Sequence, residues 1–158
     1  MRSRRPFAVY LRDHELGAHA GVRAFERAAR SHRSRPWGSD LAQLAAQVRE
    51  DLRTERRILR SARVRRHRIA PIGVAIGERL GRLKGNGAVL RRSPTTDLVE
   101  LEALLTMVRA KRTGWRALQV AEAVDGIDLE TLVRRAEAQE RRLVRAHEQA
   151  AARAIGRR

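Results

Sequence analysis

Four long stretches of the sequence place apolar residues every three or four positions, the spacing of one face of an α-helix. The expected helices cover residues 6–30, 40–59, 93–118 and 128–147. Short segments join the first two stretches and the last two, whereas a much longer segment separates the second from the third. No stretch alternates apolar and polar residues as a strand does. The sequence therefore predicts an all-α protein, a four-helix bundle.

Three helix starts carry capping residues. Asp40 is followed three positions later by Gln43, the pattern of a capping box. Ser93 precedes Pro94, and proline suits the first helical position because its missing N–H would have no partner there. Asp128 is the third expected N-cap. These residues predict where the second, third and fourth helices begin.

The composition fits one domain with an aliphatic core. A chain of 158 residues with 42% hydrophobic content can close a single core, and only five side chains are aromatic. In the first helix the small residues Gly17, Ala18 and Gly21 lie on or beside the apolar face, so we expect a neighbouring helix to approach closely there. The predicted organisation is a basic tail, one bundle domain and a second basic tail, over residues 1–5, 6–154 and 155–158.

The chain has no cysteine, so disulfides and thiolate metal sites are excluded. The apolar run after the basic first residues is too short for a secretory signal, and no apolar span reaches the length of a membrane helix. We therefore expect a cytoplasmic protein without a transmembrane segment.

The long connection, residues 62–92, has an apolar stripe of its own. The stripe consists of Ile69, Ile72, Ile76, Leu80 and Leu83. Glycines recur at every fourth residue from Gly73 to Gly85, so we expect a short, closely packed crossover helix. A crossover between the second and third helices is the connectivity of ferritin-like bundles, whereas up-and-down bundles use short loops throughout. The length favours the crossover, and the up-and-down arrangement stays open.

Three segments carry a resemblance to a known family: YLRDHELGAHAG at 10–21, GRLKGNG at 81–87 and SPTTDLVELE at 93–102. They resemble an uncharacterised actinobacterial-type family of small helical bundles, over most of the chain from Tyr10 to Leu143. The resemblance implies a ferritin-like bundle and brings no activity with it. Di-iron members of that fold use Glu-x-x-His pairs, and none of the five histidines here has Glu three residues before it. The standard di-iron site is therefore absent.

Several polar residues interrupt the apolar stripes at similar depth along the bundle, as judged from the helical rise of about 1.5 Å per residue. With a crossover, the layer contains His14, Asp51, Glu55, Arg112 and either Glu137 or Glu140, of which we take Glu140, and it is a buried ion-pair network. With an up-and-down arrangement, it contains His14, Asp51 or Glu55, Glu102 and His147, a set that could hold a divalent metal. We favour the ion-pair network and expect no cofactor.

The net charge of +17 is almost entirely due to arginine. Self-repulsion of this size is relieved by anions or an acidic partner. The candidate anion-binding residues follow the second helix and continue through the long connection: Arg63, Arg65, Arg66, Arg68, Arg82, Lys84, Arg91 and Arg92. An acidic protein is the first expected partner, and the phosphate backbone of a nucleic acid is the alternative. A simply solvated basic surface would explain the same residues.

No catalytic constellation is recognisable. Ser93 is accounted for as a helix cap, and no nucleophile lies in an elbow motif. Residues 81–87 are rich in glycine but lack the Gly-Lys-Ser/Thr ending and the preceding strand of a phosphate-binding loop. The sequence therefore predicts a non-catalytic bundle that interacts with acidic partners, with nucleic-acid binding as the alternative and a noncanonical His/carboxylate metal site as the second alternative.

Overall fold

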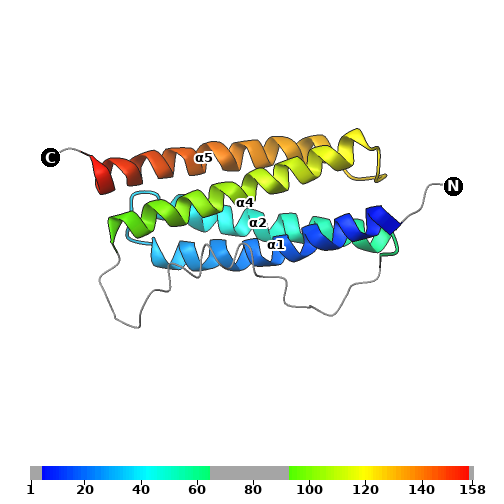
Figure 1. Ribbon diagram of the computed structural model, residues 1–158, viewed down its shortest axis with the longest axis horizontal. Helices are drawn as coiled ribbons and strands as arrows, with labels where there is room; N and C mark the ends of the chain where they lie inside the picture. The colour runs from blue at the N-terminus through cyan, green and yellow to red at the C-terminus, as the bar shows by residue number, and fades with distance from the viewer. Residues whose placement is uncertain (1–4, 65–92, 157–158) are drawn as a thin grey trace.

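The computed structural model describes residues 5–64 and 93–156, and these residues form four long helices (Figure 1). The helices are α1 (Arg5–Ser31), α2 (Gly38–Ser61), α4 (Pro94–Val120) and α5 (Leu129–Ile155). No strand occurs within the described ranges. All four helices predicted from the apolar spacing are present, and the all-α class is confirmed.

The helices pack as two antiparallel pairs, α1 with α2 and α4 with α5. In Figure 1, α2 and α4 run in the same direction, from left to right. Contacts between α2 and α5 agree with this, because Asp40 at the start of α2 meets Arg142 of α5, whereas Asp51 meets the earlier Arg135. The segment that would contain the predicted crossover helix, residues 65–92, lies outside the described residues.

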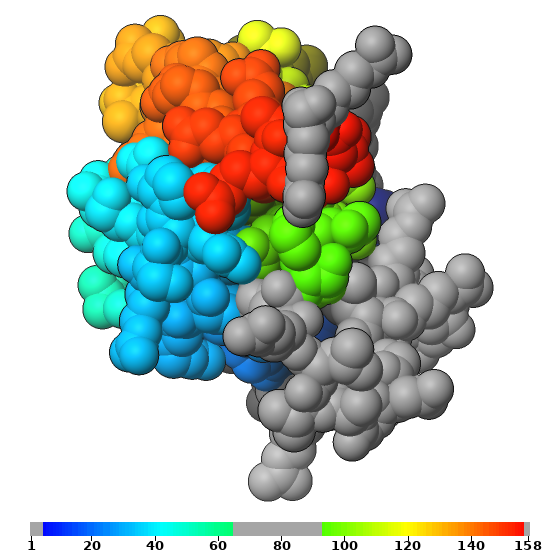
Figure 2. All heavy atoms as spheres, turned by 90° about the vertical axis from the view of Figure 1, so that its left-hand side faces the viewer, coloured from blue at the N-terminus to red at the C-terminus, as the bar shows by residue number. Residues whose placement is uncertain are grey.

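Seen from the end where α1 finishes and α2 and α4 begin, the two pairs form two layers (Figure 2). The surface of α5, in orange and red, lies over the blue and cyan surface of α1 and α2. The start of α4, in green, lies beside both. Within the described ranges, no helix has an apolar stretch long enough to cross a bilayer.

Two of the three expected caps are formed. The Ser93 hydroxyl accepts a hydrogen bond from the backbone N–H two residues on, and the Asp128 carboxylate accepts one from the N–H three residues on. The third differs, because α2 begins at Gly38 and Asp40 is already inside its first turn. Asp40 instead binds the Arg142 guanidinium, with 3.0 Å between Oδ1 and Nε.

The hydrophobic core consists of two separate clusters, one in each half of the bundle. The first cluster includes Phe25, Trp37, Leu41, Leu44, Val48, Leu98, Leu101, Leu105, Val108 and Leu143. The second cluster comprises Leu11, Ile58, Leu59, Trp115, Leu118, Leu129, Leu132, Val133 and Ala136. Between them, near the middle of the helices, several inward-facing residues are polar or small, and the buried ionisable groups Asp51 and Glu55 lie there.

Candidate functional site: the layer between the two clusters

Asp51 of α2 is the centre of the polar layer. Its side chain is almost completely buried, with 3% of the residue exposed. Lys111 of α4 donates to Oδ2 over 2.5 Å, and Arg135 of α5 binds Oδ1. The amide of Gln139 donates to Oδ2 over 3.2 Å and accepts from Lys111. The negative charge of Asp51 is thus compensated by two cations drawn from two other helices.

Lys111 is the cation that α4 contributes, and this corrects the prediction of Arg112. Burial lowers the pKa of the Lys111 ammonium, and the adjacent Asp51 carboxylate opposes that shift. Arg112 points about 100° further around the helix, as its next position in the sequence requires. There it pairs with Glu140 of α5, with 2.9 Å between Nη1 and Oε2. Arg112 and Glu140 therefore form a half-buried pair outside the layer.

Glu55 of α2, one turn beyond Asp51, is buried without a counter-ion. Only 5% of the residue is exposed, and its carboxyl makes no hydrogen bond or ion pair with any described residue. Burial raises its pKa to about 8, helped by the negative charges of Glu15 and Asp51, while Lys111 acts in the opposite direction. Near neutral pH this carboxyl is therefore largely protonated.

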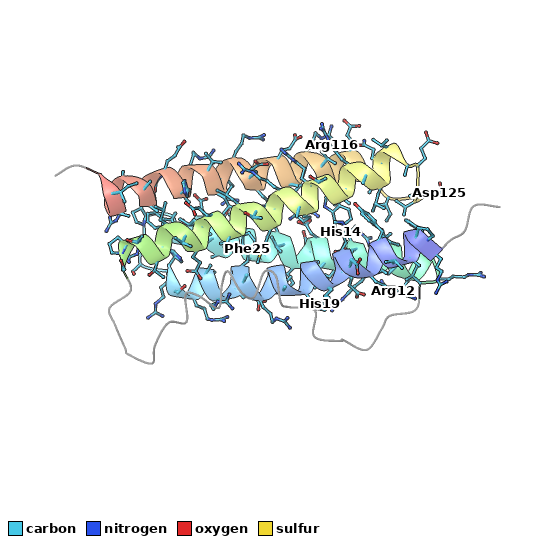
Figure 3. All side chains as sticks on the ribbon, viewed as in Figure 1. Arg12, His14, His19, Phe25, Arg116 and Asp125 are labelled. Carbon is cyan, nitrogen blue, oxygen red and sulfur yellow. The ribbon has the colours of Figure 1, made fainter. Side chains whose placement is uncertain are left out.

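His14 of α1 lies against α4. In Figure 3, His14 and Phe25 lie on the side of α1 that faces α4, whereas His19 lies on its other side. The His14 ring packs on the backbone of Gly114, where an added Cβ would lie 2.6 Å from a ring carbon. Burial lowers the pKa of His14, against the effect of the nearby Asp13 carboxylate. Burial thus favours the neutral imidazole, and the ring occupies a position that a Cβ at residue 114 would obstruct.

A cavity of about 240 Å³ opens between α1, α2 and α4 at this level. Gly17 and Gly21 line it, and a Cβ added at either glycine would meet nothing within 4 Å. These small residues therefore leave space, which corrects the expectation that they bring a neighbouring helix close. Glu55 and His14 also line the cavity, so two ionisable groups without hydrogen-bond partners among the described residues border an otherwise apolar space.

The five metal-ligand candidates do not come together. Because α4 runs parallel to α2, Glu102 lies far from the cavity and pairs with His147 of α5, with 3.2 Å between Oε1 and Nε2. His14, Asp51 and Glu55 share the cavity wall. In the part of the chain that the structure describes, no three His, Cys, Asp or Glu side chains are arranged to hold a metal ion.

A second buried polar network, at the start of α4, was not predicted. His32 is fully buried; its Nδ1 accepts from the Trp37 indole over 2.9 Å, and its Nε2 donates to Glu100 over 2.9 Å. Beside it, Arg35 pairs with the buried Asp97, with 2.7 Å between Nε and Oδ2. These contacts join the α1–α2 turn to α4. His32 lies in a segment that the sequence predicts to be a loop. The sequence does not indicate that its partner lies more than sixty residues away.

The two helix pairs differ sharply in charge. Residues 5–64 contain 13 arginines and 7 acidic residues, a net charge of +6, whereas residues 93–156 contain 10 basic and 10 acidic residues and are neutral. The arginine stripe is a row of exposed side chains on α2, namely Arg49, Arg53, Arg57 and Arg60. Arg49 pairs with Glu26 of α1, while Arg53 and Arg60 form no ion pair with described residues.

Of the predicted anion-binding residues, only Arg63 can be placed. It is exposed, just beyond the end of α2, and its backbone has the left-handed φ of 52°. The others, Arg65, Arg66, Arg68, Arg82, Lys84, Arg91 and Arg92, lie outside the described residues. The sequence pattern that would have revealed the arginine stripe is the repeat of arginine at positions 49, 53, 57 and 60 on the polar face of α2.

Comparison with protein-family models, with curated proteins and with solved structures found no match for this chain.

Proposed function

We propose that the protein is a non-catalytic interaction bundle that binds an acidic macromolecular partner through the arginine stripe of α2. The observation that carries the proposal is the segregation of charge: the first helix pair is basic and the second is neutral. A cationic surface of this kind attracts acidic partners over several ångströms and accelerates their association.

The burial of two acidic residues of α2 leaves the outer face of this helix more basic. Asp51 and Glu55 both point into the bundle, so their carboxylates do not neutralise the outer face. Glu50 is the one exposed acidic residue of that helix. Four residues advance a helix by about 6 Å, so Arg49, Arg53 and Arg57 present guanidinium groups at regular intervals. Arginine binds carboxylates with paired, parallel hydrogen bonds, which suits an acidic protein segment.

A nucleic acid is the second candidate, because the same regular spacing suits a phosphate backbone. The stripe offers no polar or aromatic side chains for reading base edges, so such binding would be independent of sequence. The affinity for either partner would fall steeply as the salt concentration rises. The experiment must therefore compare the two polyanions directly.

Binding of a fluorescent polyglutamate peptide and of labelled duplex DNA should be measured over a salt series with the full chain. The test variant is Arg53→Gln with Arg57→Gln, and its matched control is Arg141→Gln with Arg145→Gln, an exposed pair with the same spacing on α5. We expect the α2 variant to lose at least tenfold in affinity for polyglutamate near physiological salt, and the α5 variant less than threefold. Equal losses would show that only net charge matters and would refute the proposal. A stronger preference for DNA would favour the second candidate.

Ferritin-like connectivity is proposed for the chain, with a crossover helix within residues 65–92. The parallel directions of α2 and α4 support this, because two consecutive parallel helices need a connection that returns along the bundle. Membership of the actinobacterial-type family and a cytoplasmic location stay predictions from the sequence. The described residues gather no set of three ligands, so they do not support the metal-binding alternative.

A further inference from the structure

The cavity between α1, α2 and α4 has an apolar wall with one unsatisfied acid. Its apolar lining includes Phe25, Val48, Leu52 and Trp115. Its buried acid is Glu55, which lacks any hydrogen-bond donor or counter-ion among the residues described. A buried carboxyl without a partner costs free energy that a bound donor would recover. The cavity therefore presents an acid without a protein partner to any group that enters it.

No described cation contacts Glu55 directly. Lys111 is already engaged by Asp51 and Gln139, so it does not neutralise Glu55 by direct contact. We propose that the cavity binds a small apolar amine whose ammonium group pairs with the Glu55 carboxylate while its apolar body fills the space beside Gly17 and Gly21. The cavity and the arginine stripe lie on different faces of α2. The cavity selects a small cation, whereas the stripe selects a large anion.

The cavity volume sets the size of the ligand. A protein cavity of about 150 Å³ is known to hold benzene, so about 240 Å³ accommodates on the order of ten non-hydrogen atoms. Exposed lining residues mark the route of entry, because Asp13 and Gly17 of α1 and Ala110 of α4 are all at the surface. An amine of this size can therefore reach Glu55 through the seam between α1 and α4.

Binding is coupled to the release of a proton. The ionisable groups that act on Glu55 or share its cavity are Tyr10, Asp13, His14 and Glu15 of α1, Asp51 of α2 and Lys111 of α4, with Arg135 of α5 behind Asp51. Burial lowers the pKa of His14, which favours the neutral imidazole, so this group adds no strong repulsion for the ligand. Because Glu55 has a pKa of about 8, it must lose its proton to pair with an ammonium group. Affinity should fall about tenfold for each pH unit below 7.

The test uses three probes of similar size and different charge: 2-phenylethylamine, 2-phenylethanol and phenylacetate. Calorimetry with the full chain at pH 7.5 should show the amine binding at least tenfold more tightly than the alcohol, with phenylacetate weakest. Repeating the amine titration in two buffers of different ionisation enthalpy should show about three-quarters of a proton released. Equal affinity for amine and alcohol, or no binding of the amine at millimolar concentration, would overturn the proposal.

Three variants locate the site. Glu55→Gln keeps the shape of the side chain and removes its charge. It should lower the affinity for the amine at least tenfold and change the affinity for the alcohol less than threefold. Glu50→Gln removes an exposed carboxylate of the same helix, which lies 3.6 Å from Arg135 and does not line the cavity, and it should change neither. Gly17→Leu should fill the cavity and abolish binding of both probes, with thermal melting to show that the variant is folded. Unchanged amine affinity in Glu55→Gln would refute the assignment. The Arg53 and Arg57 variants should leave amine binding intact, so this site and the arginine stripe can fail separately.

Discussion

Replacing Glu55 by glutamine should make the protein more stable, and the gain should grow with pH. In the unfolded chain the carboxyl ionises with its ordinary pKa of 4.5, whereas in the folded bundle the pKa is about 8. Below pH 4.5 the group is protonated in both states and does not oppose folding. As pH rises towards 8, the unfolded state binds fewer protons than the folded state, so folding stability is lost.

The size of the effect follows from the shift. Each unit of pKa difference corresponds to about 1.4 kcal/mol, so the loss reaches about 3 kcal/mol at pH 7 and about 5 kcal/mol above pH 8. Glutamine has nearly the same shape and never ionises. Glu55→Gln should therefore match the parent at pH 4 to within about 1 kcal/mol and exceed it by several kcal/mol at pH 9.

Urea unfolding at constant ionic strength, repeated from pH 4 to pH 9, measures this difference directly. At each pH the free energy of unfolding of the parent is subtracted from that of the variant. This difference cancels the titration of the other groups to first order. Glu50→Gln is the control, since its carboxylate is exposed and should show no pH-dependent gain. If the difference in free energy of unfolding between the parent and Glu55→Gln stays constant from pH 5 to pH 8, the reasoning that this carboxyl is buried without a partner is refuted.

Three further substitutions test the same layer. Gly21→Ala should raise the free energy of unfolding by about 1 kcal/mol, because alanine is the better helix former and its Cβ meets open space. Gly114→Ala should lower it by about 1 kcal/mol and move the His14 pKa towards its usual value, since the new Cβ displaces the ring; urea unfolding and NMR titration of His14 measure the two effects. Asp51→Ala should cost about 3–5 kcal/mol by urea unfolding, because Lys111 then stays buried without its carboxylate; a loss below 1 kcal/mol would contradict the buried network.

The helices and the depth of the polar layer could be predicted because both follow from local rules. Apolar spacing locates a helix without knowledge of its neighbours, and a fixed rise per residue converts sequence position into depth. His14, Asp51 and Glu55 were accordingly expected at one level, and all three line one cavity. Ser93 and Asp128 were identified as caps because capping depends on only a few consecutive residues.

The partners within the layer depended on quantities that the sequence does not fix. Lys111 and Arg112 are adjacent, so an uncertainty of one position in the stripe of α4 exchanges the buried cation for the outer one. Gly17 and Gly21 are compatible with either close packing or a cavity, and only the distance between α1 and α4 decides. His32 contacts Glu100 only because the tertiary fold brings α4 to the α1–α2 turn. Apolar periodicity does not predict such a contact.

The division of the core into two clusters also determines how the helices align along their axes. Leucine- and alanine-rich faces would pack almost as well after one helix slid by a turn, about 5.4 Å, because each leucine would meet another. Such a slide of α2 would carry Asp51 away from Lys111 and into one of the two apolar clusters, leaving a charge unpaired. The penalty of several kcal/mol for that state removes the competing alignments. The ion-paired layer near the middle thus helps a largely leucine- and alanine-rich interior to adopt one arrangement.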